Sequence, residues 1–254
     1  MYTIVMTACV QPAETGIRVS RSDPQVRLQD YLQSVEAWLA MDDPDCEQVI
    51  FLENSGYPLD EVRRLGDSPL ALRPLIAAHV GDNAVPEGVS YGYAELGMLD
   101  AASQSLGAWA SADLLVKATG RLRFPALPRL IDRVGAGVQF LGDARNRSLP
   151  RYRTSENGVI TTQLLAFTPD FYGDHMLGLR EAMRPAMGHR LIESVIYRQL
   201  FPLEDGRRVR FRFPVSCDPL GHAGHWEKQY QSGADLSKSK ARSLSRAIVP
   251  WWWG

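Results

Sequence analysis

The sequence has no excess of charge of either sign. The chain of 254 residues carries 28 Lys and Arg residues against 29 Asp and Glu residues, which gives a formal net charge of −1. Proteins dedicated to nucleic-acid binding usually show a basic excess or a basic stripe. The balance argues against that class and predicts no nucleic-acid partner, so any anion binding must depend on a local cluster of basic residues.

Cysteine is also scarce. Cys9, Cys46 and Cys217 are widely separated, and the chain has no Cys-x-x-Cys pair and no Cys/His spacing of a zinc site. We therefore expect neither a disulfide framework nor a structural metal site. We interpret the three residues as free thiols in a reducing compartment.

Long hydrophobic runs and the common catalytic signatures are missing too. No stretch reaches the ~18 apolar residues of a membrane span, and residues 1–6 lack the features of a secretory signal. The chain has no Walker A, GxGxxG, GxSxG or HExxH pattern, which argues against the common NTPase, dinucleotide, hydrolase and metalloprotease classes. We expect a soluble cytoplasmic protein.

Short apolar runs typical of buried strands alternate with segments of helical periodicity in the first half of the chain. The strand-like runs are residues 2–10, 49–52, 75–80 and 114–116. The helical segments are residues 24–39, 59–65 and 93–110. This alternation predicts an α/β fold with a doubly wound, mostly parallel sheet.

The second half adds two strand-like runs, residues 138–141 and 161–167, and a helical segment at residues 191–200. No repeat and no linker divides the chain, so we expect a single domain over residues 1–236. A basic, tryptophan-rich tail over residues 237–254 follows it.

In a parallel sheet, ligands bind beyond the carboxyl ends of the strands. This rule selects residues 8–12, 53–56 and 117–121, which follow three of the predicted strands. The candidate ligand site is therefore expected where these three segments meet.

Several short motifs occur in and around these segments. They are residues 7–12 (TACVQP), 23–24 (DP), 27–31 (RLQDY), 53–56 (ENSG), 90–95 (SYGYAE), 117–122 (KATGRL), 167–172 (FTPDFY) and 192–193 (IE). Their order and spacing resemble those of bacterial glycosyltransferase-like proteins of capsule, O-antigen and lipooligosaccharide synthesis. The resemblance implies a fold similar to the GT-A type, with a nucleotide-binding half and an acceptor-binding half, and a nucleotide-sugar donor.

The sequence departs from the usual GT-A pattern because no Asp-x-Asp follows the strand at residues 114–116. Lys117 and Arg121 follow it instead, and such a cationic pair can replace a metal as the counter-charge of a leaving diphosphate. Thr119 offers a hydroxyl group, and Gly120 would let the backbone approach the phosphate. The sequence thus supports no metal site and no certain cofactor; the alternative for the two cations is ordinary surface ion pairs.

Further candidates for donor binding follow the first two strands and open a helix. They are Thr7 and Ala8, then Glu53, Asn54, Ser55 and Gly56, and finally Tyr91, Gly92 and Glu95. A carboxylate such as Glu53 can bind ribose hydroxyls, although the same residues are also typical of an Asx-type turn. Glu95 equally fits an acidic first turn of a helix.

The candidate catalytic residues are two carboxylates. Asp170 follows a predicted strand and is the first choice as general base for the acceptor hydroxyl, with Glu193 as the second. His222 and His225 lie on a polar, aromatic loop, which either closes over the substrates or is an inert surface loop.

The tail combines basic residues with Trp251, Trp252 and Trp253. This composition suits a membrane–water interface, or else the indoles pack back on the domain. The sequence therefore predicts a glycosyltransferase that moves a sugar from a nucleotide-sugar donor to a glycan acceptor, lipid-linked, at the inner face of the cytoplasmic membrane. A nucleotidyltransferase and a non-catalytic nucleotide- or sugar-binding protein stay open as alternatives.

Overall fold

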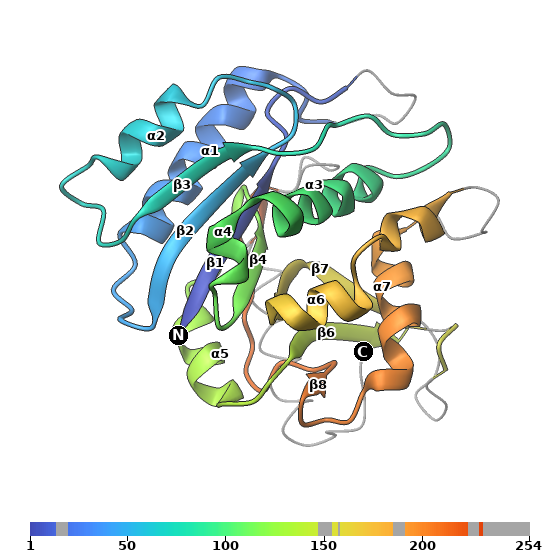
Figure 1. The fold of residues 1–254 in the computed structure, drawn as a ribbon. Helices are drawn as coiled ribbons and strands as arrows, with labels where there is room; N and C mark the ends of the chain where they lie inside the picture. Colours follow the sequence, from blue (N-terminus) through green and yellow to red (C-terminus); the bar gives the residue numbers. More distant parts are fainter. Residues whose placement is uncertain (14–19, 147–153, 157, 185–190, 223–228, 231–254) are drawn as a thin grey trace.

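A computed structural model describes residues 1–13, 20–146, 154–156, 158–184, 191–222 and 229–230 (Figure 1). Its main sheet contains seven strands in the described part of the chain. They are β1 (Tyr2–Ala8), β2 (Cys46–Glu53), β3 (Leu75–His79), β4 (Leu115–Thr119), β6 (Phe140–Asn146), β7 (Gly158–Phe167) and β8 (Val209–Arg210). A smaller sheet contains β5 (Leu122–Arg123), β9 (Leu220–His222) and β10 (Gln229–Tyr230).

The main sheet has the order β3-β2-β1-β4-β7-β6-β8. The pairs β1–β2, β2–β3, β1–β4 and β6–β8 are parallel, whereas β7 runs antiparallel to both β4 and β6. One strand of the seven is thus reversed, and the predicted mostly parallel α/β sheet is confirmed.

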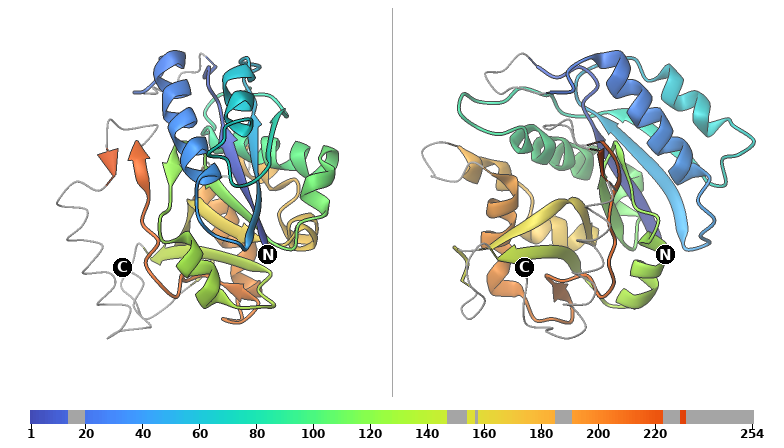
Figure 2. Two further views of the ribbon diagram at one scale, coloured as in Figure 1. Left: turned by 90° about the vertical axis from the view of Figure 1, so that its left-hand side faces the viewer. Right: turned by 180° about the vertical axis from the view of Figure 1, so that it is seen from behind.

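Helices cover both faces of this sheet (Figures 1 and 2). One face packs on α1 (Pro24–Leu39), α2 (Asp60–Gly66) and α5 (Leu127–Val134). The other packs on α3 (Gly92–Ser105), α4 (Gly107–Ala110), α6 (Pro169–His175) and α7 (Ile192–Leu200), with the 3-10 turns Leu179–Met183 and Phe201–Leu203 beside them. The sheet is therefore doubly wound.

The alternation of side chains along β1 supplies both cores. Ile4 and Met6 lie in the core under α1, and Val5 lies in the core under α3, because successive residues of a strand point to opposite faces. Pro24 starts α1, and the Asp23 carboxylate caps it by accepting hydrogen bonds from two backbone N–H groups.

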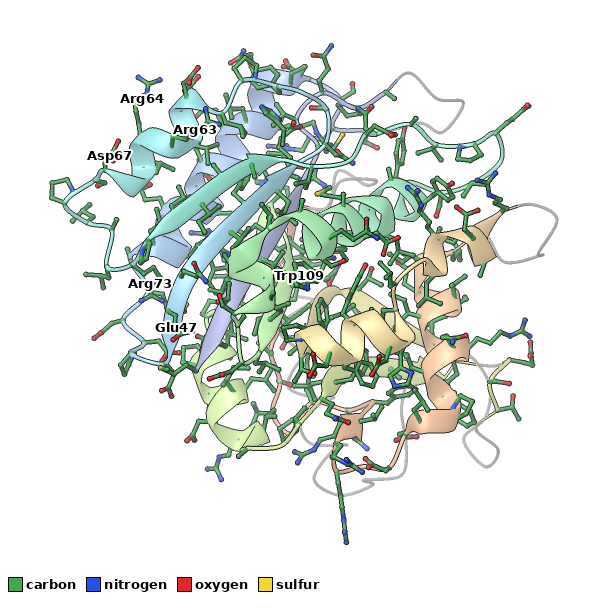
Figure 3. The ribbon with its side chains drawn as sticks, in the orientation of Figure 1. Glu47, Arg63, Arg64, Asp67, Arg73 and Trp109 are labelled. Carbon is green, nitrogen blue, oxygen red and sulfur yellow. The ribbon has the colours of Figure 1, made fainter. Side chains whose placement is uncertain are left out.

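The core under α3 centres on aromatic rings. Trp109, labelled in Figure 3, packs at 5.8 Å from the Phe167 ring and at 5.1 Å from the Tyr172 ring. These contacts join α4, β7 and α6, so they pack the two helices against the reversed strand.

Two expectations need correction. The predicted helix over residues 93–110 is interrupted at Leu106, whose backbone is extended (φ −102°, ψ 114°), so α3 and α4 are separate helices. The strand-like run at residues 138–141 only overlaps the start of β6, which begins at Phe140 and continues to Asn146, and the run at residues 161–167 is the second part of the longer strand β7. Among the described residues no helix is long and apolar enough to cross a membrane, and the predicted tail lies outside the described residues.

Candidate functional site

An open cavity of about 400 Å³ lies at the carboxyl ends of β1, β2 and β4. It includes most of the residues that the sequence singled out. Those in its wall are Thr7, Ala8, Asn54, Tyr91, Gly92, Glu95, Thr119, Arg121, Glu193 and His222. The parallel register explains the convergence, because the last residues of β1 pair with the last residues of both β2 and β4.

Arg121 is the central cation of this cavity. Its side chain is 8 % exposed, and its Nε and Nη1 atoms are buried with no hydrogen-bond partner among the described residues. Burial lowers the pKa of the Arg121 guanidinium, but a guanidinium keeps its charge at any physiological pH. The cavity therefore presents a desolvated positive charge.

A second arginine faces the same space. The guanidinium groups of Arg27 and Arg121 lie 5.9 and 5.8 Å from the centre of the Tyr31 ring. Arg27 donates hydrogen bonds to the backbone carbonyl of Cys9, at 2.7 Å, and to the Tyr31 hydroxyl, at 3.1 Å. These acceptors orient the Arg27 guanidinium but are uncharged, so its positive charge adds to that of Arg121.

Lys117, in contrast, does not line the cavity. It is 1 % exposed, and its Nζ atom lies 2.6 Å from Glu95 Oε1 and donates to the Thr162 carbonyl at 2.5 Å. The same Glu95 oxygen accepts from the Thr7 hydroxyl at 2.8 Å. The expected role of Lys117 as a phosphate ligand is therefore not supported, because its charge is neutralised inside the protein.

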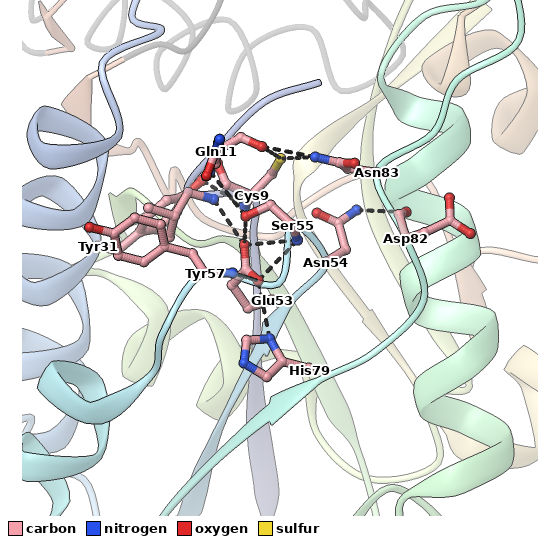
Figure 4. A network of polar contacts seen from close by, with 11 residues as sticks. Cys9, Gln11, Tyr31, Glu53, Asn54, Ser55, Tyr57, His79, Asp82 and Asn83 are labelled. Atoms are coloured by element: carbon pink, nitrogen blue, oxygen red, sulfur yellow. Dashed lines mark hydrogen bonds and ion pairs between the residues drawn. The ribbon is translucent and has the colours of Figure 1, made fainter. Parts of the chain in front are cut away.

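Glu53 is fully buried and also lies outside the cavity wall. Its carboxylate accepts from the backbone N–H of Val10 at 3.0 Å, of Ser55 at 2.9 Å and of Tyr57 at 3.2 Å. It also contacts His79 Nδ1 at 3.2 Å. Figure 4 shows this network, which ties the loop after β1 to the loop after β2. Glu53 positions the cavity wall and does not face a ribose.

The remaining residues of the Glu53 motif shape the turn. The Ser55 hydroxyl contacts Glu53 and accepts from the backbone N–H of Gln11, and Gly56 has a φ of 74°. A positive φ of this size favours glycine. Neither residue lines the cavity, so Ser55 and Gly56 shape a turn, which was the alternative to donor binding for this motif.

Two glycines are required by packing. A Cβ on Gly120 would lie 2.6 Å from the Thr7 carbonyl oxygen, and one on Gly92 would lie 2.5 Å from Ile192 Cβ. Gly120 therefore lets β4 leave the sheet close to β1, and its expected approach to a phosphate is corrected, since it does not line the cavity. Gly92 lines the cavity and lets the start of α3 contact the start of α7.

The opposite wall carries acidic and amide groups. Glu193 lies in the first turn of α7, and Gln163 lies near the middle of β7, next to Leu164, which pairs with Ala118 near the end of the antiparallel strand β4. Gln163 donates to the hydroxyl of Tyr230 on β10. One wall of the cavity is thus cationic and the other presents a carboxylate and hydrogen-bonding groups.

The small sheet closes the outer side of the cavity. His222 on β9 lines it, and its Nδ1 atom lies 3.7 Å from Asp30 Oδ1. Asp30 in turn accepts two hydrogen bonds from Arg21, at 2.5 and 2.8 Å. His222 thus lines the cavity, whereas His225 lies outside the described residues.

Asp170 is not at the cavity. It is an exposed residue at the start of α6, directly after β7. Because β7 is antiparallel, its last residue, Phe167, pairs with Leu115 at the beginning of β4. The expected position of Asp170 at the cleft is therefore wrong, since Asp170 lies near the amino end of β4, whereas the cavity lies at the carboxyl end of that strand.

Sequence reasoning missed several wall residues. They include Arg27, Tyr31, Asn83, Ser90, Thr162, Gln163 and Tyr230. Arg27 and Tyr31 are four residues apart on α1, on the face that packs on the sheet, and this spacing was the available signal. Within the described ranges, no group of three or more His, Cys, Asp or Glu residues could hold a metal ion.

Comparisons with known proteins give only distant similarity. No protein-family model matches the sequence, and no curated protein matches it. One similar solved structure is the galactosyltransferase LgtC in complex with donor and acceptor sugar analogs, with 13% identity, a TM-score of 0.49, and coverage of 78% of this chain and 70% of that chain.

Two other similar structures are named as synthetases or synthases. The CMP:2-keto-3-deoxy-manno-octonic acid synthetase complexed with CTP has 13% identity, a TM-score of 0.47, and coverage of 96% of this chain and 99% of that chain. The 4-diphosphocytidyl-2C-methyl-D-erythritol synthase from Anaerococcus prevotii has 9% identity, a TM-score of 0.45, and coverage of 95% and 97%. At these identities and TM-scores the similarity concerns the general arrangement of strands and helices, and it carries no argument about the site.

Proposed function

We propose that the protein is a nucleotide-sugar-dependent glycosyltransferase and that the Arg27–Arg121 wall binds the diphosphate of the donor. The observation that supports this proposal most directly is Arg121, a residue that is 8 % exposed and whose Nε and Nη1 atoms have no hydrogen-bond partner in the described part of the chain. A buried donor left without a hydrogen-bond partner costs about 1–3 kcal/mol, and more when the donor is charged. An anionic ligand that pairs with Arg121 would recover this interaction energy.

In the proposed reaction the arginines act on the leaving group and Glu193 acts on the acceptor. The acceptor hydroxyl attacks the anomeric carbon, the bond between that carbon and the phosphate oxygen breaks, and the diphosphate leaves with the electron pair. Arg27 and Arg121 would stabilise the charge that develops on the leaving group. Their charges would let the transfer proceed without a metal.

Glu193 is our candidate for accepting the proton of the acceptor hydroxyl, because it lies in the cavity on the wall opposite the arginines. Glu95 also lines the cavity, and its carboxylate pairs with Lys117 and accepts a hydrogen bond from Thr7. Asp170 has no part in this proposal.

A product assay tests the function. The purified protein is incubated with UDP-, GDP-, dTDP- and CMP-linked sugars and a lipid-linked glycan acceptor, with and without EDTA, and the released nucleotide is measured. We expect acceptor-dependent release of a nucleoside mono- or diphosphate that EDTA leaves unchanged and Glu193→Gln lowers at least tenfold.

A parallel reaction contains the four nucleoside triphosphates with sugar phosphates. Release of pyrophosphate there, with no turnover of nucleotide sugars, would show nucleotidyl transfer instead. Binding of a nucleotide with turnover in neither reaction would indicate a non-catalytic binding protein, and no binding at all would refute a nucleotide site.

We also propose that the tail brings the enzyme to its lipid-linked acceptor at the inner face of the membrane. Basic residues followed by Trp251, Trp252 and Trp253 support this, because indoles favour the headgroup region and cations favour anionic lipid. Flotation with phosphatidylglycerol-containing vesicles should be lost when the residues after Ala247 are deleted, and unchanged flotation would refute the proposal.

A further inference from the structure

The cavity contains a second buried polar group without a partner, and it is an acceptor. Asn54 is 6 % exposed and lines the cavity at the carboxyl end of β2. Its Nδ2 atom donates to the Asp82 carbonyl at 3.2 Å (Figure 4). Its Oδ1 atom is buried with no hydrogen-bond partner among the described residues.

The bond to Asp82 fixes the orientation of the amide. A backbone carbonyl only accepts hydrogen bonds, so the atom that faces Asp82 must be the NH₂ group, and Oδ1 takes the other side. A buried acceptor that stays unpaired costs about 1–3 kcal/mol. A ligand that supplies an N–H or O–H donor at this point would recover this cost, whereas a phosphate oxygen would be repelled.

The sheet order separates this acceptor from the anion site. Asn54 follows β2 and Arg121 follows β4, and β1 lies between these two strands. Neighbouring strands are about 4.8 Å apart, so the ends of β2 and β4 are about 10 Å apart. One ligand that reaches both sites needs an anionic end and a hydrogen-bond donor about two strand spacings away.

We infer that Asn54 determines specificity by accepting a hydrogen bond from an N–H group of the nucleobase, an inference that rests on the proposed nucleotide donor. In a nucleotide the ribose is attached directly to the phosphate and so lies over β1 when the phosphate is at Arg121. The base is attached to the far side of the ribose, and its edge extends to the end of β2. A base edge carries N–H donors, which Asn54 Oδ1 needs.

Among the described residues, Arg73 has the same unpartnered atoms as Arg121 but does not line a cavity. Arg73, labelled in Figure 3, is also 8 % exposed and also has unpartnered Nε and Nη1 atoms. Arg73 lies two residues before the first residue of β3, at the amino ends of the parallel strands, and lines neither described cavity. Asn54 and Arg121 are unpartnered groups of opposite kinds in one cavity, so a single ligand can satisfy both.

Three probes test the inference on the full chain. Dissociation constants are measured by calorimetry for inorganic pyrophosphate, for ribose 5-phosphate, and for UDP, CDP, GDP, ADP and dTDP. We expect at least one nucleoside diphosphate to bind more tightly than pyrophosphate. Asn54→Leu, which has a similar volume and no acceptor, should weaken that nucleotide about tenfold and leave pyrophosphate and ribose 5-phosphate unchanged.

Asn54→Asp is the matched variant, because it keeps an acceptor oxygen at this position. Its added charge can weaken all anionic probes, but the ratio of nucleotide to pyrophosphate affinity should stay within about threefold of wild type. Thermal unfolding without ligand checks that both variants are folded.

The outcomes are distinct. If Asn54→Leu weakens pyrophosphate as much as the nucleotide, Asn54 only supports the loop and the inference is wrong. If Asn54→Leu weakens ribose 5-phosphate as much as the nucleotide, a ribose hydroxyl is the donor and the inference is also wrong. An unchanged affinity of Asn54→Leu for the nucleotide relative to pyrophosphate would overturn the inference as well. If the wild type binds no nucleoside diphosphate, the proposed function itself fails.

Discussion

The two basic residues at the end of β4 should respond to the same substitution in opposite ways. Lys117 lies within β4, on the face covered by α3, and pairs with Glu95 at 2.6 Å. Arg121 follows the strand and faces α1, where its Nε and Nη1 atoms have no partner in the described part of the chain. Methionine at either position keeps an unbranched apolar side chain and removes only the charge and its donors.

Lys117→Met should destabilise the protein strongly. It leaves the Glu95 carboxylate without its counter-charge and removes the donor to the buried Thr162 carbonyl. Removing one partner of a buried ion pair costs about 3–5 kcal/mol of unfolding free energy. Arg121→Met removes a desolvated charge whose Nε and Nη1 atoms donate no hydrogen bond to the described residues. The unfolding free energy should therefore change by less than about 1 kcal/mol or increase.

Arg121→Met, which changes stability little, should have a large effect on ligand binding. A guanidinium that donates two hydrogen bonds to a diphosphate contributes about 3 kcal/mol, so Arg121→Met should raise the Kd of a nucleoside diphosphate roughly a hundredfold. Urea denaturation followed by circular dichroism measures stability, and calorimetry at a temperature where both variants are folded measures binding.

Two results would refute this reasoning. If Arg121→Met destabilises the protein as much as Lys117→Met, the guanidinium serves the fold and its unpartnered atoms do not mark a ligand site. If Arg121→Met is stable and binds every nucleotide like the wild type, the anion does not bind at this wall.

Three further variants test the elements around the cavity. Glu53→Gln should lower the unfolding free energy by about 2–3 kcal/mol in urea, because the amide replaces an acceptor of several backbone N–H groups with a donor. Gly120→Ala should cost about 1–3 kcal/mol in the same assay, since the new Cβ would lie 2.6 Å from the Thr7 carbonyl oxygen. Burial raises the pKa of Asp100, which accepts from the Tyr172 hydroxyl at 2.6 Å, so the wild type should lose stability relative to Asp100→Asn as pH rises through the raised pKa. The unfolding free energies of both proteins are measured by denaturation between pH 4 and 8. If the wild type gains stability relative to Asp100→Asn as the pH rises, the direction of the pKa shift is contradicted.

The first half of the fold follows from the sequence because its signals are local. Alternating apolar strands and amphipathic helices predict a parallel sheet, and the parallel sheet brings the ends of β1, β2 and β4 together. This reasoning led to Asn54 and Arg121. It failed at Asp170 because an apolar run such as residues 161–167 does not reveal the direction of its strand. Direction depends on pairing with distant residues, and here β7 is reversed.

The sequence also could not separate Lys117 from Arg121. Both are cations near the end of one strand, but the period of two places Lys117 on the same face as Leu115, under α3. Arg121 lies beyond the last strand residue and turns toward α1. Which cation stays without a counter-charge is decided by residues far away in the sequence, 22 positions in the case of Glu95 (117 − 95).

The charge of the cavity follows from how the nearby carboxylates are engaged. On the α3 face, Glu95 neutralises Lys117. On the α1 face, Asp30 acts electrostatically on Arg121, but both of its oxygens accept hydrogen bonds from Arg21. The acid that could neutralise Arg121 is thus already paired, and Arg27 is held by uncharged acceptors. A chain with a net charge of −1 therefore presents a cationic wall in the cavity at the carboxyl ends of its central strands, where an anionic ligand can supply the missing counter-charge.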